Sequence, residues 1–359
     1  MALTHATSTH PATGGGYTRR VIDEVRAQIK ASDRVLHEAR IRRDLIKETA
    51  EHFPGSERSF SSGSIAHGTV NRPVSDADAG IVVTWQQYPA LGPDGAGVGP
   101  NQLVEDMREF IREAVAGDYP GARTFITKRA IKVFFNDPLE GQDPTADLVV
   151  ALDRRSGRGL WIPNTERDGW DPSHPERHTE LAHEANSQTG SLWAKIVRLA
   201  KANNRGYSEP ALCSFNVEAL ALGCVERGDL GLNLLRFFQH AELQLRRGLT
   251  PDPAGVSADI KLLSEPDVAV RRMAKAAEAV ARALKHDYDE EIVREALADV
   301  FPGQLALPER SPYLARLATE LDGGGAGLRG GAAIGVLPTA LGRTIKPTRS
   351  HGESRDGER

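Results

Sequence analysis

Hydrophobic residues recur at helical spacing near the start of the chain. Between Tyr17 and Phe53 they lie three or four positions apart, as in the run from Val21 to Ile29, which is the spacing of one face of an α-helix. Ser32 and Asp33 interrupt the pattern, and both residue types are common at helix N-termini. The segment is therefore predicted to form one or two long helices.

Between about Ser59 and Trp161 the pattern changes to short runs of β-branched and apolar residues. These runs are AGIVVTW (79–85), AIKVFF (130–135) and ADLVVAL (146–152), and Gly, Pro and Asp separate them. Such runs bounded by turn-forming residues are typical of β-strands. A helix is expected over 102–115, joined to the first strand by a Pro- and Gly-rich loop. This part of the chain is predicted to form a mixed sheet.

After Glu184 the hydrophobic spacing is helical again. Four segments carry it: 191–204, 215–227, 230–245 and 268–284. The predicted fold class is therefore α+β, a mixed sheet with flanking helices followed by a helical lobe. We expect the sheet lobe and its N-terminal helices to span 17–185 and the helical lobe 186–321. The polar, Gly-containing ends, 1–16 and 322–359, are expected to be flexible, and the second could be handed to a regulatory protein partner.

Composition and charge narrow the class of protein. Hydrophobic residues make up 40% and charged residues 26% of 359 residues, as in soluble globular proteins. No apolar run approaches the roughly 20 residues of a membrane span, and no secretory signal is recognisable, so a cytoplasmic protein without membrane contact is expected. The net charge of −4 argues against clamping long nucleic acid through its phosphates. A phosphate-bearing ligand is expected to be small.

A glycine–serine pair and two aspartates carry the first chemical signal. Gly63 and Ser64 stand where a loop should turn into a helix, a place where backbone N–H groups and a hydroxyl bind phosphate. Asp76 and Asp78 then enter the first predicted strand. Residues two apart in a strand point to the same face, so both carboxylates can reach one site. Their mutual repulsion favours a shared divalent cation.

A third carboxylate is needed if two metal ions are to support phosphoryl transfer. Asp147 opens the run 146–152 and is the preferred candidate, whereas Asp153 at the far end of that run is the weaker one. A solitary Asp-x-Asp is usually a solvated turn, and a solitary Gly-Ser is weaker still. Together with a further carboxylate at a later strand, the pattern favours a functional site.

The sequence GSIAHGT followed by DAD resembles the signature of the polymerase β-like nucleotidyltransferases. Three further segments resemble the bacterial CD-NTases, which are cyclic-oligonucleotide synthases related to cyclic GMP-AMP synthase and the oligoadenylate synthases. These segments are LWIPNTERDGWDPSHPERHTELAHEANSQTGSLWAKIVRLAKANN (160–204), ALCSFNVEAL (211–220) and TPDPAG (250–255). The resemblance covers about Tyr17 to Leu321 and implies the polymerase β-like nucleotidyltransferase fold.

The resemblance also implies an activity and a set of site residues. Asp76, Asp78 and Asp147 would be the catalytic ligands of Mg²⁺, with Mn²⁺ as an alternative, and nucleoside triphosphates would be the substrates. The triphosphate would be contacted by Gly63, Ser64, Lys201 and Ser214. The implied product is a cyclic di- or trinucleotide second messenger, made with release of pyrophosphate, in an anti-phage defence system (CBASS).

Two alternatives remain at this stage. The same carboxylates occur in enzymes that modify a macromolecule, such as tRNA nucleotidyltransferases or toxin-type transferases that act on tRNA or protein. The chain could instead be a catalytically silent nucleotide sensor, although the three intact aspartates argue against it. Lys201 on its own would be an ordinary solvated helix residue.

Overall fold

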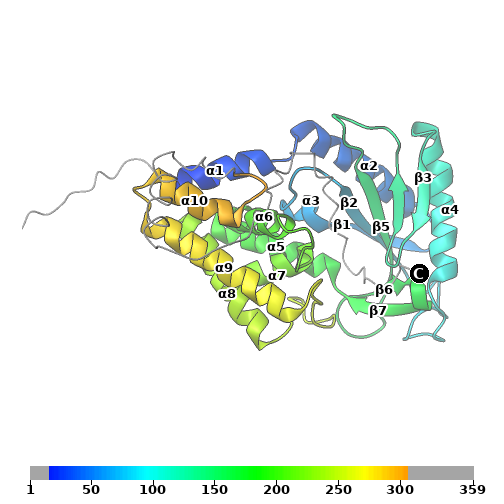
Figure 1. Cartoon of the computed structure of the whole chain (residues 1–359). Coiled ribbons are helices and arrows are strands. Elements are labelled where there is room, and N and C mark those ends of the chain that lie inside the picture. The colour runs from blue at the N-terminus through cyan, green and yellow to red at the C-terminus, as the bar shows by residue number, and fades with distance from the viewer. Residues whose placement is uncertain (1–15, 306–359) are drawn as a thin grey trace, which may run out of the picture.

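The computed structural model describes residues 16–305 (Figure 1). The predicted flexible ends, apart from Gly16, and the last part of the predicted helical lobe lie outside the described residues. Two helices come first, α1 (Tyr17–Ile29) and α2 (Asp33–Glu51). The side chain of Ser32 accepts a hydrogen bond from the Val35 N–H, so it caps α2 and separates the two helices as its position predicted.

Within the described residues, seven strands form a mixed sheet in the order β1-β2-β5-β4-β3, with β6 paired to β5 and β7 to β6. Strands β2 and β5 are parallel, and the other strand pairs are antiparallel. The strands are β1 (Ser56–Ser62), β2 (Asp76–Val83), β3 (Arg123–Ile126), β4 (Ile131–Phe134), β5 (Thr145–Asp153), β6 (Leu160–Asn164) and β7 (Gly169–Ser173). The three predicted strands correspond to β2, β4 and β5, whereas β1, β3, β6 and β7 lack a strong apolar pattern and were not predicted.

One face of the sheet is covered by α2 and α4 (Asn101–Asp118), and the other faces the helical lobe (Figure 1). Ile81 of β2 and Leu148 of β5 lie fully buried in the core beneath these helices, together with Ile46 and Met107. Because side chains alternate along a strand, burying this set turns the intervening residues of β2 and β5 toward the helical lobe. The predicted helix over 102–115 is confirmed as α4.

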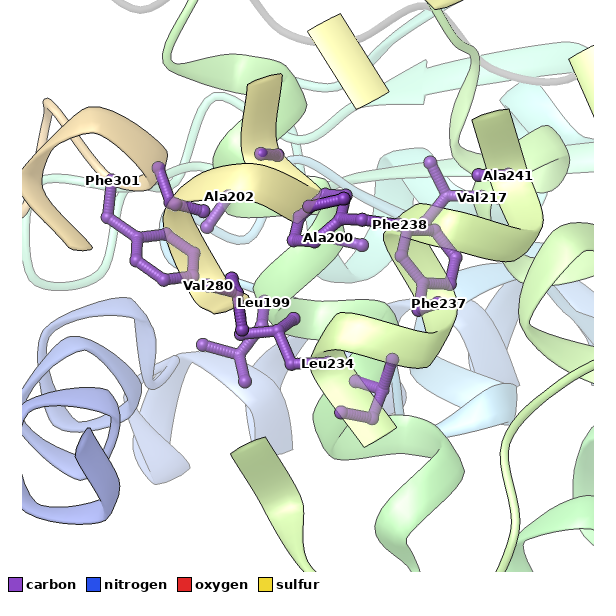
Figure 2. Packing of buried hydrophobic residues seen from close by; sticks show 14 of the residues in the cluster. Leu199, Ala200, Ala202, Val217, Leu234, Phe237, Phe238, Ala241, Val280 and Phe301 are labelled. Carbon is purple, nitrogen blue, oxygen red and sulfur yellow. The ribbon is translucent and has the colours of Figure 1, made fainter. Parts of the chain in front are cut away.

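The helical lobe packs around α6. Its helices are α5 (Pro175–Thr189), α6 (Leu192–Arg205), α7 (Ser214–Leu222), α8 (Leu230–Arg247), α9 (Pro266–Lys285) and α10 (Glu290–Val300). Figure 2 shows Leu199 of α6 among Leu234, Val280 and Phe301, all fully buried. The four predicted helical segments are confirmed as α6 to α9. No helix of the described residues is long and apolar enough to cross a membrane.

Helix α1 packs on the helical lobe although it precedes the sheet in the chain (Figure 1). Val21, Ile22 and Val25 are fully buried in the core of that lobe, and the Thr18 hydroxyl donates a hydrogen bond of 3.0 Å to the carbonyl of Ala283 in α9. The predicted division at 185/186 placed these residues with the sheet lobe, whereas their packing joins them to the helical core. The apolar period of α1 predicts a helix, but it cannot say which core the helix joins.

Candidate active site

Three aspartates lie side by side on the face of the sheet that looks toward the helical lobe. Asp76 and Asp78 are two positions apart at the start of β2, and Asp78 is directly opposite Asp147 on the parallel strand β5. Adjacent strands are about 4.8 Å apart, so all three carboxylates can reach a common ligand. The sequence predicted the first pair, and the strand register brings Asp147 to it.

The electrostatics of this group are unfavourable for three negative charges. Burial raises the pKa of Asp78 well above its usual value, and repulsion from Asp76 and Asp147 raises it further. Lys132 of β4 lies opposite Asp147, with its Nζ 3.2 Å from the Asp147 Oδ2. Burial by itself would lower the pKa of Lys132, but attraction by Asp147 and Asp76 outweighs burial and raises it. The site therefore attracts positive charge.

The donor set suits a hard divalent cation, because carboxylate oxygens are the ligands that Mg²⁺ prefers. Among residues 16–305, no three His, Cys, Asp or Glu side chains are already arranged to hold a metal ion. Asp76, Asp78 and Asp147 are nevertheless neighbours on one face of the sheet, and their mutual repulsion favours a bound cation. The residues fit the predicted metal, and their role as ligands remains a prediction.

The glycine–serine turn packs directly against the aspartates. Helix α3 (Gly63–His67) begins there, as predicted. Gly63 has a φ of +71°, and a Cβ at this position would lie 1.8 Å from the Asp78 Oδ2. Only glycine tolerates both the left-handed backbone and the close approach of the carboxylate. The turn and the carboxylates are therefore one packed unit.

One cleft is lined by all of the predicted site residues. From the sheet lobe come Gly63, Ser64, Asp76, Asp78 and Asp147, and from the helical lobe come Lys201 on α6 and Ser214 at the start of α7. Asp153 lies at the other end of β5 from Asp147, and its Oδ1 is 3.7 Å from the Arg58 Nη2. The structure thus brings the preferred set together and leaves the weaker candidate outside the cleft.

Several cleft residues had not been predicted. Lys128, Arg129 and Arg205 line it, which adds positive charge beside the aspartates. Burial lowers the pKa of Arg205, and Asp76 partly opposes that shift. Arg205 lies one helical turn beyond Lys201, so helical spacing alone could have placed it on the same face of α6. The other basic residues come from the β3–β4 connection, which has no recognisable pattern.

Lys201 is buried and paired. The residue is 2% exposed. Its Nζ donates to the Glu218 Oε1 at 2.6 Å and to the Thr69 Oγ1 at 3.0 Å. Burial would raise the pKa of Glu218, but Lys201 and then His67 hold it far below its usual value. The alternative of a solvated helix residue is therefore wrong for Lys201. Glu218 was visible in the sequence only as part of the SFNVE segment.

Comparisons with known proteins give the fold. No protein-family model matches the chain, and no curated protein matches its sequence. Escherichia coli MS115-1 CdnC, solved with ATP, superposes with a TM-score of 0.64 at 17% identity, covering 82% of this chain and 99% of CdnC. CdnG from Bradyrhizobium diazoefficiens, a CD-NTase solved with GTP, gives 0.58 at 15% identity, covering 78% of this chain and 94% of CdnG.

The Vibrio cholerae cyclic AMP-GMP synthase DncV, solved with a linear intermediate, gives a TM-score of 0.52 at 15% identity, covering 81% of this chain and 87% of DncV. At such identities the likeness concerns the backbone arrangement, and it extends across both lobes. The expected α+β architecture is confirmed. The chain has the fold of the bacterial CD-NTases, the group that contains CdnC, CdnG and DncV.

Proposed function

We propose that this protein is a metal-dependent nucleotidyltransferase that joins nucleoside triphosphates into a cyclic di- or trinucleotide and releases pyrophosphate at each bond. One observation carries the proposal: Asp78 and Asp147 face each other across parallel strands and pack against the Gly63 turn, in a cleft that Lys201 of the other lobe also lines. This arrangement is suited to in-line displacement at a phosphate held between the lobes.

Each part of the cleft has a role in this reaction. Mg²⁺ held by Asp76, Asp78 and Asp147 would neutralise phosphate charge and make a ribose hydroxyl easier to ionise. Asp147 accepts the proton of that hydroxyl. Ser64, with the backbone of Gly63, binds the donor triphosphate, and Lys201 and Ser214 donate to it from the helical lobe. Positive charge beside the leaving pyrophosphate stabilises the charge that develops there.

The proteins of the same fold support this proposal. CdnC was solved with ATP, CdnG with GTP and DncV with a linear nucleotide intermediate, so triphosphates are the natural substrates to test. CdnC was also solved in a complex with HORMA-deltaN, which makes a regulatory protein partner a reasonable part of the proposal. We further propose that the product is a second messenger in anti-phage defence, acting in the cytoplasm on a separate effector.

Incubation of the purified protein with the four labelled ribonucleoside triphosphates and Mg²⁺ or Mn²⁺ tests the proposal. A product that resists phosphatase is expected, because a cyclic oligonucleotide has no terminal phosphate. The double variant Asp76→Asn/Asp78→Asn should form none and serves as the control. Label that appears only in added tRNA or protein would instead identify an enzyme that modifies macromolecules. Absence of any transfer, with retained nucleotide binding, would identify a sensor.

A further inference from the structure

A buried polar network joins the two lobes beside the cleft, and three of its residues, His67, Lys201 and Glu218, line the cleft. Glu218 on α7 is 7% exposed, and it meets three partners that are also buried: Lys201, Thr69 and His67. Its Oε1 accepts from the Thr69 hydroxyl at 2.6 Å and from the Lys201 Nζ at 2.6 Å. Its Oε2 lies 2.8 Å from the His67 Nδ1. One carboxylate thus contacts α6 and the segment around α3 together.

The hydrogen-bond count of Lys201 leaves room for a ligand. An ammonium has three N–H donors and no acceptor. Within residues 16–305, the Lys201 Nζ bonds to two atoms, the Glu218 Oε1 and the Thr69 Oγ1. Lys201 nevertheless lines the cleft that also holds the aspartates. One donor of a fixed, desolvated cation is therefore left for an oxygen that enters the cleft.

The same carboxylate reaches the phosphate-binding turn. His67 is the last residue of α3, the short helix that begins with Gly63 and Ser64. The His67 Nε2 lies 3.1 Å from the hydroxyl of Thr179 on α5, and the His67 carbonyl accepts from the Asn186 Nδ2 at 3.1 Å. Thus α3 packs closely against Asp78 at its Gly63 end, and at its His67 end it contacts Glu218 and α5.

We propose that Glu218 is a positioning residue. It holds Lys201 so that one N–H donor faces the triphosphate, and through His67 it fixes the position of the Gly63–Ser64 turn relative to Lys201. This inference rests on the proposed function, because it takes the triphosphate as the ligand. A buried cation is retained only beside a counter-charge. Glu218 thereby makes Lys201 available to phosphate before nucleotide arrives, and binding energy is not spent on ordering the lysine.

A double-mutant cycle tests the proposal on the full chain. Glu218→Gln keeps the shape and removes the charge, Lys201→Met removes the cation at similar length, and the double variant removes both. The kcat/KM for triphosphate and the Tm are measured for each, together with the affinity for the non-hydrolysable analogue α,β-methylene-ATP. Glu226→Gln is the matched control, since the Glu226 side chain is 72% exposed and pairs with Arg236 on the surface.

Each single variant should lower kcat/KM at least tenfold, mainly through KM, and Glu226→Gln should not. Because Glu218 acts in part through Lys201, the double variant should lose less than the product of the two single losses, and what it loses beyond Lys201→Met is the part that runs through His67. Its Tm should recover relative to both single variants, since no unpaired buried charge remains, while its activity should not. Activity that recovers along with Tm would show a purely structural role, and losses that multiply would show that Glu218 acts independently of Lys201. Either result overturns the proposal.

A milder variant covers the case in which Glu218→Gln does not fold. Thr69→Val has nearly the same shape but removes the hydroxyl that contacts both Lys201 and Glu218, so KM should rise several-fold. Wild-type kinetics in Thr69→Val would overturn the proposal. If the wild type binds α,β-methylene-ATP but forms no product, the proposed function fails, and the same cycle is applied to the Kd. If the wild type binds no triphosphate, both proposals fail.

Discussion

Gly63→Ala tests whether the glycine–serine turn and the aspartates act as one unit. Gly63 has a φ of +71°, and its added Cβ would lie 1.8 Å from the Asp78 Oδ2, whereas ordinary contact begins at 3.4 Å. The left-handed backbone costs about 1–2 kcal/mol for an alanine. In addition, the Asp78 carboxylate must move away from the added methyl group. Misplacement of a catalytic group by about 1 Å can lower the rate on the order of 100-fold.

Gly68→Ala is the matched control at the other end of α3. Gly68 has a nearly identical φ of +72°, but nothing lies within 4 Å of its added Cβ, so it carries the backbone cost alone. Both variants should lose a few degrees in Tm. Pyrophosphate release from mixed triphosphates should fall roughly 100-fold in Gly63→Ala and stay near wild type in Gly68→Ala. Equal activities in the two variants would refute the packing of the turn against Asp78 as a requirement for the reaction.

Three further predictions concern charge and the chain end. Because burial and its neighbours raise the pKa of Asp78, the ionised carboxylate destabilises the fold at neutral pH. Asp76→Ala/Asp78→Ala should therefore abolish transfer, while its Tm stays the same as that of the wild type or rises. The gain in Tm should shrink as the pH falls through the raised pKa of Asp78. A gain in Tm that grows toward acid pH would contradict the direction of the pKa shift. Lys201→Ala should lower kcat/KM roughly 10- to 150-fold. Because the variant leaves the buried Glu218 without its lysine partner, the free energy of unfolding in denaturant should also fall by about 3–5 kcal/mol. Unchanged kinetics would show that Lys201 does not contact the triphosphate. A truncation after Leu321 should keep the Tm and the basal synthesis of the full chain, because the Gly-rich sequence of the removed segment has no apolar face to bury. Loss of product in the purified system would show that this segment contributes to the reaction.

Local sequence signals anticipated the parts of this protein that depend on near neighbours. The apolar period placed α4 and α6 to α9, because one buried face is enough to define a helix. Ser32 marked the start of α2 through a hydrogen bond three residues away. Asp76 and Asp78 were placed on one face by the two-residue period of a strand. These relations hold over a few residues whatever the rest of the chain does.

The tertiary structure decided which of these elements meet. The register of β2 on β5, set by burial of their apolar residues under α2 and α4, brings Asp147 to Asp78 and leaves Asp153 outside the cleft. Lys132 reaches Asp147 because β4 pairs with β5, and the run 130–135 predicts the strand but not its partner. Helix α1 joined the helical core because that core supplies the matching apolar surface.

The pairing of Lys201 with Glu218 shows the physical reason for this division. Lysine and glutamate usually lie on the solvated face of a helix. Here the packing of α6 and α7 against the segment after α3 excludes water from both side chains. An ion pair of this kind is weak in water. Once water is excluded, neither charge can be buried without the other. The sequence by itself determined most of the helices, the faces of the predicted strands and the chemical types available, but not α5 or α10. Burial and strand register, which depend on the whole chain, determined the site.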